Sequence, residues 1–227
     1  MRRIPAREWL DDDLGTPEEV RASLDDLWWL NRKWGGLSSY GELLREALDG
    51  ARGRRLRWLE VGAGTGQVTE ALRRQLASDG YALEPCLLDR SPTHLRPAGG
   101  VASRLPAVAG DVLRAPFEDA SFDLVSCSLF LHHFSGEAAV AMLAAMARLS
   151  RGAVVVNDLA RSWPLYVFVH LLGRFAASRL TRHDAPLSVR QAYTLEELRE
   201  LAQAAGLKRF STRRVRPYRL GLVARVG

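Results

Sequence analysis

One short segment constrains the fold more than any other: a run of glycines placed between a predicted strand and a predicted helix. Residues 56–61 form an apolar run typical of a buried strand, and residues 67–76 carry an apolar stripe at helical spacing. Gly62-Ala63-Gly64-Thr65-Gly66 stands between them. Glycines let such a turn be tight and let a ligand approach the backbone without meeting Cβ atoms. The amides at the start of the helix then face polar groups of that ligand.

The rest of the chain repeats the alternation of strand and helix. Further apolar runs typical of strands occupy residues 83–88, 105–109, 122–126 and 153–157, and helical patterns occupy 16–33, 39–48, 137–149 and 194–205. Short apolar strands that alternate with helices indicate a parallel sheet covered on both faces. Two final strand-like runs, 207–215 and 218–226, have no helix between them and predict an antiparallel hairpin. We therefore expect an α/β, Rossmann-like, seven-stranded sheet, mostly parallel, with a C-terminal antiparallel hairpin and helices on both faces.

The domain organisation follows from the absence of repeats and low-complexity linkers. We expect residues 1–227 to form a single domain, with an N-terminal helical cap at 1–52 and a lid-like insertion at 160–192. The insertion follows the fifth strand, at the sheet edge where open α/β folds bind ligands. Its apolar stretch, 163–177, contains Tyr166, Phe168 and Phe175. It predicts either a dry lid over an aromatic or lipid-like substrate or a helix packed on the domain core.

Composition excludes several classes of protein. With 47% hydrophobic and 26% charged residues, the chain is an ordinary globular protein. Cys86 and Cys127 form neither a disulfide framework nor a metal-ligand spacing, so we expect reduced thiols, no metal site and a cytoplasmic location. Met1-Arg2-Arg3 is followed by proline and charge instead of a signal-peptide h-region. The apolar stretch at 163–177 is too short for a transmembrane segment.

The net charge of +6 raises the question of a nucleic-acid partner. Apart from Lys33 and Lys208, every basic residue is an arginine, and the arginines are scattered, with small clusters at 52–55 and 213–216. A dedicated nucleic-acid surface more often concentrates its charge on one element. We therefore expect no nucleic-acid partner, and keep an RNA-modifying enzyme as the alternative.

The spacing of the glycine run separates two kinds of nucleotide-binding fold. The dinucleotide fingerprint needs a third glycine where this chain has Gln67, which disfavours a nicotinamide-dependent oxidoreductase. An acid, Glu60, also stands two residues before the first glycine. The resulting E-x-G-x-G-x-G pattern resembles the first motif of class I S-adenosylmethionine (SAM)-dependent methyltransferases. The resemblance implies that this loop holds the methionine end of SAM, through Glu60, Gly62, Ala63, Gly64 and Gly66.

Three further matches follow in the order of that family. Asp89-Arg90 ends the second strand, where a carboxylate can accept both hydroxyls of a ribose. Gly110-Asp111-Val112 follows the third strand, where the family places an acid near the adenine. Phe122-Asp123-Leu124-Val125 resembles the family's fourth strand, whose end passes close to the methyl donor, and Ser128 follows this strand. The resemblance covers residues 56–158 and implies SAM as the cofactor.

The sequence after the fourth strand narrows the resemblance. Leu131-His132-His133-Phe134 is similar to the Leu-His-His found there in the ubiquinone/menaquinone-biosynthesis type of small-molecule methyltransferases. Nucleic-acid base N-methyltransferases usually carry an Asn/Asp-Pro-Pro-aromatic motif, and this chain has Ser126-Cys127-Ser128-Leu129-Phe130 instead. The resemblance implies a small acceptor, aromatic or apolar, with O-methylation favoured and C-methylation next. The oligomeric state stays open.

Histidines are the candidate catalytic residues. His132 and His133 lie just beyond the strand that approaches the methyl donor, and the unperturbed histidine pKa of about 6.5 suits proton acceptance near neutral pH. We expect one of them to act as a general base, His133 before His132, with His183 of the insertion as the third candidate. The competing interpretation is that an imidazole only hydrogen-bonds the backbone there.

Overall fold

The computed structural model describes residues 1–12, 14–95 and 105–227. Its strands form one seven-stranded sheet in the order β3-β2-β1-β4-β5-β7-β6. Their bounds are β1 Arg55–Val61, β2 Ala82–Asp89, β3 Ala107–Ala109, β4 Phe122–Ser128, β5 Ser150–Leu159, β6 Arg209–Val215 and β7 Arg219–Arg225. Strands β1 to β5 pair in parallel, whereas β7 runs antiparallel to both β5 and β6. The predicted sheet and its closing hairpin are confirmed.

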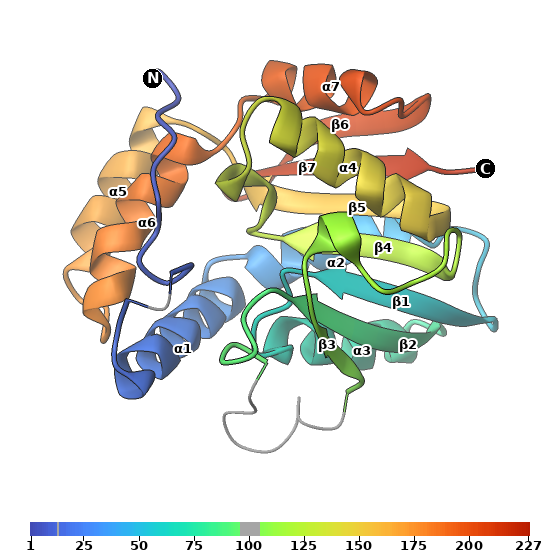
Figure 1. Cartoon of the computed structure of the whole chain (residues 1–227), viewed down its shortest axis with the longest axis horizontal. Helices are drawn as coiled ribbons and strands as arrows, with labels where there is room; N and C mark the ends of the chain where they lie inside the picture. Colours follow the sequence, from blue (N-terminus) through green and yellow to red (C-terminus); the bar gives the residue numbers. More distant parts are fainter. Residues whose placement is uncertain (13, 96–104) are drawn as a thin grey trace.

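Helices cover both faces of this sheet (Figure 1). The helices are α1 Pro17–Lys33, α2 Gly36–Ala47, α3 Gln67–Ser78, α4 Glu137–Leu149, α5 Trp163–Gly173, α6 Arg179–Gln191 and α7 Leu195–Ala204. Helices α4 and α7 pack on one face, and α2 and α3 pack on the other. Each face has its own apolar core: Leu143, Met146 and Val154 belong to the first, and Leu44, Trp58 and Leu76 to the second.

The observed bounds of two strands differ from the predicted ones, because the number of neighbouring strands determines how far each strand extends. The third strand is shorter than expected, since β3 pairs only with β2, over three residues at the edge of the sheet. The fifth strand is longer, because β5 has a partner on each side. Among the described residues, no helix has the length and apolar character needed to cross a membrane.

A third group of elements lies beyond the carboxyl ends of the parallel strands. Helices α1, α5 and α6 contact one another there, and the segment 1–12 runs across them (Figure 1). Thr16 caps α1 through a capping box with Glu19, as the sequence predicted. The segment is fastened to α6, because Asp184 accepts the backbone N–H groups of Trp9 and Leu10. We call segment 1–12, α1, α5 and α6 the roof.

Candidate functional site

The carboxyl ends of β1, β2 and β4 open into a cavity of about 810 Å³, which the roof closes from the other side. All but one of the residues predicted to bind the cofactor line this cavity: Glu60, Gly62, Ala63, Gly64, Asp89, Arg90, Asp111, Val112 and Ser128. The exception is Gly66, which takes a left-handed conformation at the start of α3. The cavity size lies within the range common for small-molecule sites.

The glycine loop leaves room for a ligand at its middle position. Gly62 and Gly64 have φ angles of 64° and 54°, which side-chain-bearing residues rarely adopt. A Cβ on Gly62 would collide with the ring of Phe130, so this glycine is needed for packing. A Cβ on Gly64 would meet no atom closer than 3.8 Å, a methyl of Leu24 across the cavity. The loop therefore offers bare backbone to whatever fills the cavity at Gly64.

Asp89 connects the end of β2 to that loop. Its carboxylate accepts the backbone N–H of Gly64 at 2.8 Å and that of Ser91 at 3.0 Å. Burial raises the pKa of this carboxyl, but hydrogen bonds, chiefly from His94, outweigh burial and bring it below its usual value. Asp89 is therefore an ionised acceptor on the cavity wall, with lone pairs left for hydroxyl donors.

Glu60 lies deeper and is part of a buried polar network. One of its carboxyl oxygens accepts the hydroxyls of Tyr40 and Ser126, both at 2.6 Å. Trp58 donates its indole N–H to the same serine. Burial raises the Glu60 pKa to about 8, although the hydrogen bonds oppose the shift. At neutral pH the carboxyl is therefore protonated in the folded protein.

Two further predicted residues hold local structure at the cavity wall. Asp111 caps the short 3-10 helix η2, Val112–Arg114, by accepting the N–H of Leu113 at 2.9 Å. The hydroxyl of Ser128 accepts the side-chain amide of Asn157 at 3.0 Å.

The roof supplies an apolar wall opposite the strand ends. It comes from the inward side chains of two helices: Leu24, Leu27, Trp28 and Leu30 of α1, and Leu165, Phe168 and Val169 of α5. Of the three aromatic residues that the sequence suggested for a lid, Phe168 lines the cavity, whereas Tyr166 and Phe175 do not. Phe175 is 86% exposed and follows the end of α5.

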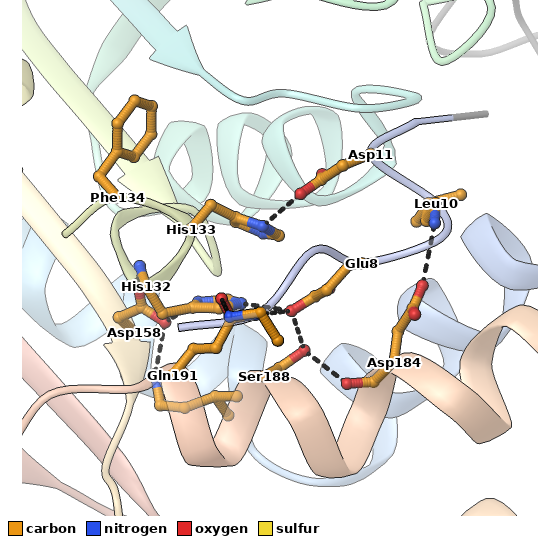
Figure 2. Close-up of polar contacts among 12 residues, drawn as sticks. Glu8, Leu10, Asp11, His132, His133, Phe134, Asp158, Asp184, Ser188 and Gln191 are labelled. Carbon is orange, nitrogen blue, oxygen red and sulfur yellow. Dashed lines mark hydrogen bonds and ion pairs between the residues drawn. The ribbon is translucent and has the colours of Figure 1, made fainter. Parts of the chain in front are cut away.

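His132 is held between two carboxylates (Figure 2). It lies in the short 3-10 helix η3, Leu131–His133, and is buried. Its Nδ1 lies 2.7 Å from Asp158, and its Nε2 lies 3.6 Å from Glu8. Burial disfavours a charged imidazole, but the two carboxylates outweigh it and raise the His132 pKa to about 10. His132 is therefore charged near neutral pH and cannot accept a further proton.

His133 has the arrangement that a base needs. Its Nδ1 lies 2.7 Å from a carboxylate oxygen of Asp11, which leaves Nε2 free of that contact (Figure 2). Its ring stacks on that of His132 at 4.2 Å between centroids. Both His133 and Asp11 line the cavity. A carboxylate on one ring nitrogen fixes the tautomer and presents the other nitrogen to a substrate.

Glu8 completes this cluster from the N-terminal segment. One oxygen of its carboxylate accepts from Ser188 at 2.7 Å and from Gln191 at 2.9 Å, both on α6. Glu8, His132 and His133 also offer ligand atoms within 4.8 Å of one another, close enough to share a metal ion. The Glu8 oxygen nearest His132 already has two donors, so the ion-pair network accounts for the cluster.

His183 lies elsewhere. It is on α6, stacks on the ring of Trp9 at 3.7 Å and bonds to Asp184 at 2.7 Å. It does not line the cavity. The residues that sequence reasoning missed are Glu8 and Asp11, because nothing in the local sequence connects an acid before the first helix with histidines more than a hundred residues later.

Comparison with known proteins supports a methyltransferase. A methyltransferase-domain family model matches residues 59–152, from β1 into β5, and thus spans the glycine loop, Asp89 and the two histidines. Residues 59–152 form a methyltransferase domain, and the enzyme is a SAM-dependent methyltransferase. No curated protein matches the sequence at a significant level.

Solved structures similar to this methyltransferase share its fold at low sequence identity. Magnesium protoporphyrin IX methyltransferase from Synechocystis is 18% identical over 85% of this chain and 83% of its own, with a TM-score of 0.57. An O-methyltransferase family 2 protein from Planctomyces limnophilus, solved with apigenin, is 20% identical, with a TM-score of 0.61. Human N-acetylserotonin methyltransferase is 15% identical, with a TM-score of 0.61.

The last two structures belong to longer chains, so the alignment leaves part of each of them unmatched. The alignments take in 92% and 91% of this chain, but only 62% of the Planctomyces protein and 57% of the human one.

Proposed function

We propose that this methyltransferase transfers the methyl group of SAM to a small aromatic or apolar acceptor bound between the strand ends and the roof. One observation carries the proposal: the Asp11–His133 pair and the glycine loop line the same cavity. O-methylation is favoured, since a phenol-like hydroxyl needs a base to take its proton. C-methylation is the next candidate. A ring-containing acceptor is supported by three of the similar structures: the magnesium protoporphyrin IX methyltransferase, the N-acetylserotonin methyltransferase and the protein solved with apigenin.

The strand ends fit SAM. The open position at Gly64 gives the methionine end a place against bare backbone, and the carboxylate of Asp89 suits ribose hydroxyls. Asp111 and Val112 would then lie at the adenine, with Arg90 and Ser128 farther along the same wall. SAM supplies an activated methyl on its sulfonium, so the protein mainly has to align the acceptor with it, which can contribute about 7–11 kcal/mol.

His133 is the residue that we propose takes the acceptor's proton. Asp11 holds its Nδ1 proton and orients the ring, so that Nε2 can receive the hydroxyl proton as the oxygen attacks the methyl group. The proton would end on His133, and SAM, when bound, would supply the methyl group to the acceptor oxygen and become a neutral thioether. A positioned base of this kind contributes about 10²–10⁴-fold in rate. His132 positions His133 through ring stacking.

Calorimetry with SAM and NAD, followed by a screen of phenols, quinones and tRNA with labelled SAM, tests the proposal. We expect SAM to bind and NAD not to bind. We expect label to appear in a phenol or quinone, also after treatment with EDTA. NAD binding, or labelled tRNA without labelled phenol, would contradict it and favour the oxidoreductase or the RNA-modifying enzyme.

A further inference from the structure

Helix α5 carries apolar side chains on two opposite sides, and only one side is covered. At 3.6 residues per turn, Leu165 and Val169 share the side that lines the cavity. Trp163, Val167 and Leu171 share the opposite side, and they are 61%, 51% and 54% exposed. An ordinary surface helix carries polar residues on that side. A contiguous exposed apolar patch on a folded domain indicates an interaction surface.

Along the chain segment that contains α5 the charges are of one sign, although Asp26 of α1 reaches the end of this segment at the backbone of Ala177 and Ser178. Between Asp158 and Asp184 the chain has no acidic residue but four arginines. Arg161 and Arg179 are held by glutamates. Arg174 and Arg182 are exposed and form no ion pair within the described part of the chain. The helix period places Arg174 on the side of Trp163 and Val167, so this apolar surface is cationic as well.

The exposed side of α5 continues into an aromatic opening of the cavity. Trp34 and Tyr218 line the cavity and are nevertheless 42% and 45% exposed. Both contact Phe168 of α5, with ring centroids 4.7 and 6.3 Å away. The exposed Arg32 and Lys33 immediately precede Trp34. Tryptophan and tyrosine beside basic residues are typical of a surface that lies at a membrane–water boundary.

We propose that α5 docks on the surface of an anionic bilayer and that the cavity takes its acceptor from there. The acceptor would be an amphipathic lipid-like molecule, with its reactive ring at His133 and its apolar tail toward Trp34 and Tyr218. This acceptor class rests on the proposed function, whereas the docking does not. With 11 residues, α5 is too short to span a bilayer and would lie along its surface.

Charge favours a bilayer over a second copy of this chain. A two-fold contact through α5 would bring the same surface of both copies together, so that Arg174 of each copy would face a surface that is also positively charged. An anionic lipid surface instead attracts each nearby arginine or lysine and accepts the tryptophan and leucine side chains.

Flotation with lipid vesicles tests the docking. The probes are vesicles of phosphatidylcholine alone and vesicles with about 30% phosphatidylglycerol, in about 0.15 M salt. We expect the protein to float with the anionic vesicles. Leu171→Glu should weaken this binding about tenfold or more, because it places a carboxylate in the apolar patch. The matched control is Leu113→Glu, since Leu113 is 41% exposed but lies on η2, away from α5; it should bind like the parent.

Two results would overturn the docking: failure of the parent protein to float with anionic vesicles, or equal binding by Leu171→Glu. A parent dimer that Leu171→Glu converts to monomer would assign the patch to a second copy instead. Methyl transfer to a water-soluble phenol separates this proposal from the proposed function. Leu171→Glu should keep that activity, and absence of transfer in the parent would contradict the function while leaving the vesicle result intact.

Discussion

The two walls of the cavity are built from different parts of the chain. The strand-end wall comes from residues at or just after the ends of parallel strands, such as Gly64, Asp89 and Ser128, and it offers backbone N–H groups and carboxylates. The roof wall combines segment 1–12 with α1, α5 and α6, and it offers apolar side chains and Asp11, which pairs with His133 of η3. A wall whose geometry is fixed by strand pairing suits the methyl donor, which methyltransferases of this kind have in common. A wall assembled from separate helices suits an acceptor that differs among relatives.

Gly64→Val is expected to have the largest effect, on the strand-end wall alone. The valine side chain would enter the cavity from a φ of 54°, so we expect no measurable SAM binding by calorimetry and a largely intact fold by circular dichroism. Gly50→Val is the matched control, because Gly50 also has a positive φ, 77°, and has no atom near its Cβ position. It carries the same backbone strain away from the cavity and should bind SAM normally. Binding within a few-fold of the parent by Gly64→Val would contradict the loop assignment.

His133→Gln should affect proton transfer without changing either wall. We expect the single-turnover rate to fall by at least about 10²-fold, with SAM affinity preserved, because the base is lost while the strand ends are untouched. Asp11→Asn should cause a smaller loss, since it removes only the orienting carboxylate. His183→Gln serves as the control, because His183 lies outside the cavity lining.

His132→Gln should separate positioning from proton transfer within the same cluster. Removing the imidazolium leaves the buried Asp158 and Glu8 without their partner, which typically costs about 3–5 kcal/mol of stability. Chemical denaturation measures this loss. A His132→Gln protein that is as stable as the parent but slow in methyl transfer would reverse the roles of the two histidines.

Asp89→Ala should weaken SAM binding by about 1.5–3 kcal/mol, because ribose hydroxyls would lose a charged acceptor. The variant also frees the N–H of Gly64, so Asp89→Asn is the companion that keeps an acceptor oxygen and should lose less. Calorimetry gives both affinities. An unchanged affinity in Asp89→Ala would remove this residue from the cofactor site.

The smallest expected effect is on how the free energy of unfolding changes with pH, to which Glu60 of the strand-end wall and His132 of η3 both contribute. Glu60 has a folded-state pKa of about 8 against an ordinary 4.5, so unfolding releases its proton and stability falls as pH rises from 4.5 to 8. His132, with a folded-state pKa of about 10 against 6.5, contributes stability that is complete below pH 6.5 and lost as pH rises toward 10. Between pH 6 and 7 the free energy of unfolding of the parent should fall with pH, and Glu60→Gln should make this fall smaller by up to about 1.4 kcal/mol. Denaturation of the ligand-free protein at both pH values measures it, and an unchanged slope would contradict a protonated Glu60.

The sequence predicted the strand-end wall better than the roof wall. The strands and the closing hairpin followed from apolar periodicity, and Asp89 and Asp111 lie on the cavity because each lies at or just after the end of a strand of a parallel sheet. Glu8 and Asp11 could not be found in this way, since their positions depend on contacts with α6 and η3. The inward direction of Phe168 and the outward one of Phe175 likewise depended on where α5 ends, which the apolar run alone did not show.

The connection of segment 1–12 to α6 also has a consequence for folding order. Arg3 donates to the carbonyl of Gln191, a contact between residues 188 positions apart, and to the carbonyls of His132 and Phe134. Contacts of such high sequence separation carry the loop-closure cost of the intervening chain and form late. The pairing of the sheet strands includes none of these contacts, so the strand-end wall can form before the segment is in place. Glu8 and Asp11 then reach the two histidines last, and the cluster is complete only once the N-terminal segment has docked on α6.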